Sequence, residues 1–294
     1  MNLKPFLSRL LPEPWRQTIL LNRQRRSLEQ LPPAICHTHN LLELSAFLDY
    51  DIFNSGVNSP DWQRASTRLS RFEIPDMTGG VNPGDRRAIF YLTCGLGVKS
   101  VLEIGTHIGA STCHFAAALE HQGESNDLAA NPVRLVSVDR VDVNHQELKP
   151  WLDHGSKQSP KSMITELGCE HFVEFQTGKS LEFLKSHRDS YDLIFLDGDH
   201  SATTTYQEIP AAMQLLNPGG VILLHDFFPE LKPLWSNGSV IPGPLLAASR
   251  LADENNRIEV VPLGDLPWPT KLGSRKTSLA LVLQNKPETR SPAH

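Results

Sequence analysis

The chain has 294 residues, with 28 Lys or Arg against 33 Asp or Glu, and a formal net charge of −5. This length suits one large domain with or without an appendage. The charge offers no basic field that would draw nucleic acid to the surface. No apolar run approaches the roughly 18 residues of a transmembrane helix. The four cysteines form no C-x-x-C pair, which favours reduced thiols and a cytoplasmic protein.

Residues 1–78 predict helices and irregular segments, without a convincing strand. Residues 41–48 carry apolar side chains at helical spacing, and residues 61–69 predict a second helix. The pairs Pro32-Pro33 and Ile74-Pro75 interrupt the region. We expect a helical N-terminal extension that serves as a lid, as a docking element or as the contact of a homodimer.

Residues 79–294 alternate between predicted helices and strands. Asp85 is expected to cap the first helix, and Asn217-Pro-Gly-Gly220 to stop a later helix over 206–216. Apolar strands are expected at 101–104, 134–139, 172–176, 191–197, 221–226, 258–262 and 279–283. The last two have no helix-length segment between them, which predicts a hairpin. The pattern predicts an α/β fold with a doubly wound, mostly parallel seven-stranded sheet and a C-terminal antiparallel hairpin.

The stretch Val101-Leu-Glu-Ile-Gly-Thr-His-Ile-Gly-Ala-Ser-Thr112 combines a strand, a glycine turn and the start of a helix. Gly105 and Gly109 form the turn, and the helix is expected over 111–119. Such a turn places backbone N–H groups and the positive end of a helix dipole at the edge of a sheet. Open α/β sheets bind nucleotide-containing cofactors at that edge.

Acidic residues lie at or near the ends of three predicted parallel strands. They are Glu103, Asp139 and Asp197. Because parallel strands end on the same side of a sheet, all three should lie on one rim. An acid after the second strand can accept hydrogen bonds from two ribose hydroxyls. The rim therefore predicts a cofactor site.

An NAD-dependent dehydrogenase is the alternative with a similar fold. It needs Gly-x-Gly-x-x-Gly so that the backbone can touch a pyrophosphate, whereas this turn reads Gly-x-x-x-Gly. An acidic rim repels a pyrophosphate and suits a cationic cofactor without phosphate. The pattern therefore disfavours a dehydrogenase.

Three motifs resemble those of class I S-adenosylmethionine-dependent methyltransferases, and most closely the small-molecule O-methyltransferases of the catechol and macrolide-sugar types. They are VLEIGTHIG at 101–109, LDGDH at 196–200 and LNPGGVILLHD at 216–226. The resemblance spans about residues 79–285. It implies a Rossmann-like fold, S-adenosylmethionine as methyl donor and a small-molecule acceptor, with the methyl group passing to a hydroxyl oxygen. The residues after Asp197 lack the Asn/Asp-Pro-Pro-aromatic motif of enzymes that methylate bases, which again disfavours nucleic acid.

The resemblance also assigns the cofactor site. It implies that Glu103 faces the sulfonium or the methionine amine through the loop, that Asp139 holds the ribose hydroxyls, and that residues 178–180 grip the adenine. The expected cofactor-binding residues are Glu103, Gly105, Thr106, Gly109, Ser111, Asp139, Gly178, Ser180 and Asp197.

A hydroxyl acceptor must lose its proton, which requires a positioned base or a metal ion. The expected catalytic residues are His200, His225 and Asp197. The two histidines are candidate bases, because the usual pKa of imidazole suits proton abstraction near neutral pH. Metal-dependent relatives use an acid at the position of Asp197 and two adjacent residues after a later strand. Asp226 matches the first of these two positions, which makes Asp197 and Asp226 candidate Mg²⁺ ligands.

The second position of that pair is Phe227, which cannot ligate, although His225 or Asp199 can substitute. This mismatch also leaves open a catalytically inactive S-adenosylmethionine-binding partner subunit.

Overall fold

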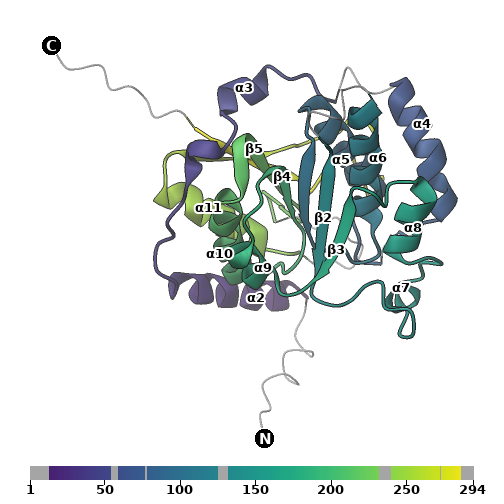
Figure 1. Cartoon of the computed structure of the whole chain (residues 1–294). Helices are drawn as coiled ribbons and strands as arrows, with labels where there is room; N and C mark the ends of the chain where they lie inside the picture. The colour runs from purple at the N-terminus through teal and green to yellow at the C-terminus, as the bar shows by residue number, and fades with distance from the viewer. Residues whose placement is uncertain are drawn as a thin grey trace, which may run out of the picture.

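The computed structural model describes residues 13–53, 59–76, 78–124, 132–231, 240–271 and 273–285. Its centre is a seven-stranded sheet in the order β3-β2-β1-β4-β5-β7-β6 (Figure 1). The strands are β1 Ser100–Ile104, β2 Arg134–Asp139, β3 Val173–Thr177, β4 Tyr191–Leu196, β5 Leu216–Leu224, β6 Ile258–Pro262 and β7 Ala280–Gln284. The first five are parallel neighbours, and β7 runs antiparallel to both β5 and β6. The predicted fold class, including the closing hairpin, is confirmed.

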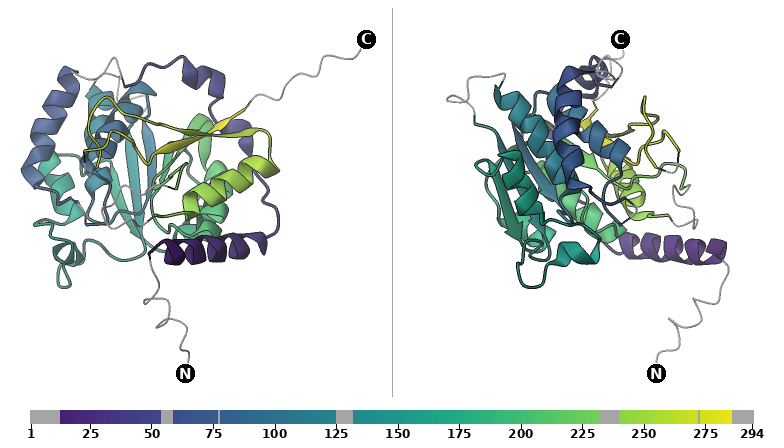
Figure 2. Two further views of the ribbon diagram at one scale, coloured as in Figure 1. Left: turned by 180° about the vertical axis from the view of Figure 1, so that it is seen from behind. Right: turned by 90° about the vertical axis from the view of Figure 1, so that its right-hand side faces the viewer.

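Helices cover both faces of this sheet (Figures 1 and 2). The α-helices are α2 Glu13–Glu29, α3 Leu44–Leu48, α4 Pro60–Leu69, α5 Pro83–Gly95, α6 Ala110–Glu124, α7 Pro150–Asp153, α8 Pro160–Leu167, α9 Ser180–Ser186, α10 Ala202–Met213 and α11 Gly243–Glu254; the 3-10 helices are η1 Thr38–Asn40 and η2 Ser70–Phe72. No described helix has the length and apolar character needed to cross a membrane.

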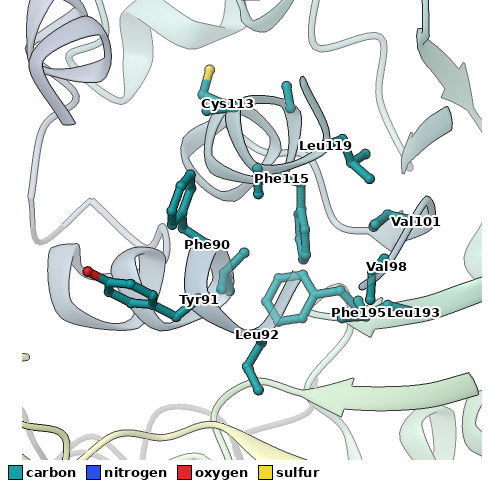
Figure 3. Packing of buried hydrophobic residues seen from close by; sticks show 14 of the residues in the cluster. Phe90, Tyr91, Leu92, Val98, Val101, Cys113, Phe115, Leu119, Leu193 and Phe195 are labelled. Atoms are coloured by element: carbon teal, nitrogen blue, oxygen red, sulfur yellow. The ribbon is translucent and has the colours of Figure 1, made fainter. Parts of the chain in front are cut away.

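The two faces of the sheet bury two separate hydrophobic clusters. Alternate strand residues serve opposite faces, so Val101 joins the cluster under α5 and α6, whereas Leu102 and Ile104 join the one under α10 and α11. In the first cluster, the ring of Phe115 on α6 packs edge-on against Phe195 of β4, with the centroids 5.5 Å apart (Figure 3).

The N-terminal extension packs on the body of the fold and extends its sheet. Leu42 N donates to Gly220 O and Gln284 N donates to Leu42 O, each at 2.8 Å, so this residue lies between β5 and β7. The helix predicted over 41–48 is therefore wrong in its first half, and α3 begins only at Leu44. In the extended conformation, Leu42 pairs with backbone groups of β5 and β7 that would otherwise lack partners, which explains why it is not helical.

Two boundaries differ from the predicted ones. Helix α10 ends at Met213, and residues 217–220 lie inside β5, where the pairing with β4 shifts register. The cap of α5 is Asn82, whose side chain accepts a hydrogen bond from Asp85 N. Asp85 occupies the third helical position instead, and its carboxylate faces the ring of His225.

Candidate functional site

A cavity of about 720 Å³ opens at the carboxyl ends of the parallel strands. The segments after β1, β2, β3 and β4 all contribute to its wall, as expected for a sheet edge where the strand order reverses. The lining residues are Gly79, Ile104, Gly105, His107, Val138, Asp139, Arg140, Gly178, Lys179, Ser180, Leu181, Glu182, Asp197, Gly198, Asp199, His200 and Thr204.

Gly105 is the point where the turn after β1 meets the segment after β4. Its φ of +102° lies in a region that favours glycine. A Cβ at this position would lie 2.3 Å from the backbone oxygen of Asp197. The missing side chain therefore keeps two segments of the cavity wall in contact and leaves the cavity open above them.

Glu103 lies beneath the turn rather than on the cavity wall. Its fully buried carboxylate accepts hydrogen bonds from the hydroxyls of Ser111, Thr112 (2.5 Å) and Ser137 (2.6 Å). The hydroxyls of Ser137 and Thr106 are themselves 2.6 Å apart. Glu103, Thr106 and Ser111 were expected to bind the cofactor, but their side chains tie β1, β2 and the first turn of α6 together.

Gly109 is also a packing residue and does not line the cavity. Its φ is +78°, and a Cβ would lie 2.9 Å from Cβ of Pro160 at the start of α8. The glycine therefore allows α8 to approach the turn closely. The expected cofactor-binding residues that do line the cavity are Gly105, Asp139, Gly178, Ser180 and Asp197.

Burial raises the pKa of Glu103 to about 7, although its three hydroxyl donors oppose the shift. Between the usual pKa and this value, the folded chain keeps a proton that the unfolded chain has lost. This group's contribution to the free energy of unfolding therefore falls as the pH rises towards 7. Glu103→Gln should remove this pH dependence. Between pH 5 and pH 8, the free energy of unfolding of the variant should therefore rise by about 2 kcal/mol relative to that of the wild type.

Denaturant unfolding at both pH values measures this gain. Glu208→Gln provides the comparison, because burial also raises the pKa of Glu208 to about 7 in the other half of the fold. The two gains should add. An unchanged pH dependence in Glu103→Gln would mean that the carboxyl group is ionised in the folded chain at neutral pH.

Asp139 ends β2 in the position expected for ribose binding. Its Oδ2 accepts from His107 N at 2.9 Å and its Oδ1 accepts from Val141 N at 3.1 Å. These amides orient the carboxylate, and each oxygen retains a lone pair for a further donor. Beyond β3, Gly178 and Ser180 line the next part of the wall, where the adenine was expected.

Asp197, His225 and Asp226 form a compact group beside the cavity. Nδ1 of His225 lies 2.7 Å from Oδ1 of Asp197 and 3.7 Å from Oδ1 of Asp226. Nε2 of His225 lies 3.5 Å from Oδ2 of Asp85, a carboxylate that is completely buried. The strand ends place these groups together, because His225 and Asp226 follow β5, the neighbour of β4.

The surroundings of His225 argue against its expected role as a base. Burial alone would lower its pKa, but the charges of Asp197 and Asp226, the hydrogen bond to Asp197 and the nearby carboxylate of Asp85 raise the pKa well above the usual value. An imidazole that is already protonated cannot accept a proton. His200, in contrast, lines the cavity, with Nε2 3.6 Å from Oδ2 of Asp226. It remains the candidate base.

The same group fits a divalent ion. One ligand atom each from Asp197, His225 and Asp226 can be chosen so that all lie within 4.8 Å of one another. Two carboxylates and an imidazole are donors that divalent ions accept, once the imidazole has released the proton on its ligating nitrogen. The two expected ligands are thus brought together, with His225 in place of the unsuitable Phe227.

Asp85 was expected to cap α5 and instead lies within its first turn. It forms a reciprocal pair with the helix cap, since Asn82 Nδ2 donates to Asp85 Oδ2 at 2.7 Å and Asp85 N donates to Asn82 Oδ1 at 3.0 Å. The spacing of an Asn and an acid three residues later is a capping-box signal. The contact with His225 has no such local signal.

Fold and cavity together define a Rossmann-like domain with a cavity at the carboxyl edge of its sheet. Residues 102–227 match a protein family described as "Methyltransferase domain". The resemblance to class I S-adenosylmethionine-dependent methyltransferases is thereby confirmed.

Similar proteins extend this finding. The chain is 24% identical to a probable caffeoyl-CoA O-methyltransferase of Dictyostelium discoideum over 182 residues, which cover 58% of this chain and 67% of that protein. It is 25% identical to a catechol O-methyltransferase of Niastella koreensis over 179 residues, which cover 60% and 69%.

Solved structures share the fold. A Bacillus cereus O-methyltransferase in complex with S-adenosylhomocysteine (SAH) has a TM-score of 0.50 at 20% identity, and the match covers 79% of this chain and 94% of that one. An SAH-bound Podospora anserina methyltransferase has a TM-score of 0.51 at 17% identity, with 83% and 94% covered.

Proposed function

We propose that the protein transfers a methyl group from S-adenosylmethionine to a hydroxyl oxygen of a small molecule. The observation that carries the proposal is the cavity in which Gly105, Asp139 and Asp197 meet at one sheet edge. The named relatives, which are O-methyltransferases, support the choice of donor and acceptor atom. The dehydrogenase alternative lacks its glycine pattern, and an inactive subunit has no comparable support.

The residues of the cavity fit the donor. Gly105 leaves room for close backbone approach, and the oriented carboxylate of Asp139 can accept from ribose hydroxyls. The bound cofactor supplies an electrophilic methyl group on a sulfonium. Asp197 adds negative charge near the place where a cation is expected.

At the acceptor end, His200 can take the hydroxyl proton. Its ring nitrogen Nε2 faces the carboxylate of Asp226, which would stabilise the resulting imidazolium. Asp197, Asp226 and His225 would hold a divalent ion such as Mg²⁺, which would lower the pKa of a bound hydroxyl.

Asp139→Ala should weaken SAH binding by about 10- to 100-fold, the loss of hydrogen bonds to a charged group. Calorimetric titration measures it. Asp142→Ala removes an exposed carboxylate three residues later and should leave the affinity within about threefold. If Asp139→Ala binds SAH as the wild type does, Asp139 does not hold the cofactor.

Formation of SAH from S-adenosylmethionine in the presence of catechols, other phenols, sugars and carboxylic acids tests the activity. Turnover with a hydroxylated compound supports the proposal, and turnover only with carboxylic acids would contradict a hydroxyl acceptor.

We further propose a cytoplasmic protein, with residues 1–78 as an N-terminal extension to the domain at 79–294 and as the contact of a homodimer. Sedimentation with and without residues 1–30 tests the dimer.

A further inference from the structure

We propose that His225 is a nitrogen ligand of the divalent ion, that Asp85 holds it in place, and that the site consequently prefers Mn²⁺ to Mg²⁺. The inference rests on the proposed function, because it concerns the acceptor end of the same cavity. It adds to the proposed site a preference among divalent ions and an outer partner for His225, which comes from α5 and lies outside the matched residues 102–227.

The distances within the group suit coordination. Neighbouring ligands of a six-coordinate ion with bonds of about 2.1 Å lie about 3 Å apart, and opposite ligands about 4.2 Å apart. Nδ1 of His225 is 2.7 Å from Asp197 Oδ1 and 3.7 Å from Asp226 Oδ1, and one ligand atom from each residue can be chosen with all three within 4.8 Å of one another. The three side chains are mostly buried, but Asp197 and Asp226 each keep about 11% exposure. An ion could therefore meet both the protein and a substrate oxygen.

Asp85 provides the outer contact that a histidine ligand needs. Histidine ligands commonly donate their second ring N–H to a carboxylate, which fixes the tautomer and the ring orientation. Nε2 of His225 faces Oδ2 of Asp85 at 3.5 Å. Asn82 Nδ2 at 2.7 Å and Ser278 Oγ at 3.2 Å donate to the same oxygen, so the carboxylate is held from two directions.

The imidazole decides the metal preference. Carboxylate and water oxygens suit both Mg²⁺ and Mn²⁺. An imidazole nitrogen separates the two ions, because the transition ion Mn²⁺ binds nitrogen better than the harder Mg²⁺ does. Phe227, the residue after Asp226, has no donor atom and is buried in the core with 4% exposure. The third protein ligand is therefore nitrogen rather than oxygen, which shifts the preference towards Mn²⁺.

Mn²⁺ binding to the metal-free full-length chain tests the inference through the electron paramagnetic resonance signal of free Mn²⁺, with Mg²⁺ as competitor. The wild type should bind Mn²⁺ at least about 10-fold more tightly than Mg²⁺. His225→Gln should lose most of this preference. Asp85→Asn should weaken Mn²⁺ binding by about 10- to 100-fold.

The control variant is Asp142→Asn, which neutralises an exposed carboxylate outside the cavity and should leave Mn²⁺ affinity within about threefold. Thermal unfolding confirms that each variant is folded, and if His225→Gln is not, Asp85→Asn decides the matter. Equal affinities for the two ions in the wild type, or an undiminished Mn²⁺ affinity in Asp85→Asn, would overturn the proposal. SAH titration of the same samples separates the outcomes, since SAH binding without Mn²⁺ preference contradicts only the inference, and absent SAH binding contradicts the proposed function.

Discussion

Gly105→Ala is expected to weaken SAH binding by at least about 100-fold and to lower the thermal midpoint. The new Cβ would lie 2.3 Å from the backbone oxygen of Asp197 and 2.7 Å from its carbonyl carbon. Rigid backbone cannot yield as a flexible side chain does, so the segments after β1 and β4 must separate. The cavity wall lies at that junction, and its geometry would change with them.

Gly97→Ala is the matched control for this substitution. Gly97 also has a positive φ, +64°, but a Cβ there meets no atom within 4 Å. It should therefore show only the backbone cost of about 1 kcal/mol, with SAH affinity unchanged. Calorimetry and thermal unfolding of both variants measure the difference. Equal effects in the two variants would mean that close approach at Gly105 is unimportant.

Asp197→Ala is expected to destabilise the fold by about 3 kcal/mol at pH 7. Removing one partner of a buried ion pair leaves the other charge less well compensated. His225, with 7% side-chain exposure, would lose its 2.7 Å contact and retain only the longer contacts to Asp85 and Asp226.

Denaturant unfolding of Asp197→Ala beside Asp199→Ala measures this loss. Asp199 is exposed, and its carboxylate accepts from Ser201 N and the hydroxyl of Thr204, so its removal should cost about 1 kcal/mol. A loss in Asp197→Ala no larger than that in Asp199→Ala would show that His225 is not charged in the folded protein.

The sheet was predictable from sequence because its strands are short apolar runs between turn signals. The conformation of the N-terminal segment was less predictable, because Leu41, Leu42 and Leu44 fit a helix or an extended chain equally well. Leu42 is extended because its backbone forms hydrogen bonds with Gly220 of β5 and Gln284 of β7. Likewise, residues 217–220 carry turn chemistry, yet pairing with β4 keeps them in a strand.

The cofactor site was predictable as far as the rule of strand ends applies. That rule places Asp139 and Asp197 on the cavity wall, where they are found. It fails for Glu103, which lies one residue before the end of β1. Strand alternation places Glu103 on the same face as Val101, towards α6, and so under the turn. The contact of Asp85 with His225 depends on tertiary packing and had no signal in the sequence.

Calorimetric titration of the purified chain with SAH tests the central claim most directly, with NADH as the comparison ligand. The acidic, glycine-lined cavity predicts saturable one-to-one binding of SAH and none of NADH, whose pyrophosphate would meet the rim of Asp139 and Asp197. Binding of NADH in preference to SAH, or no SAH binding at millimolar concentration, would contradict the assignment as a methyltransferase.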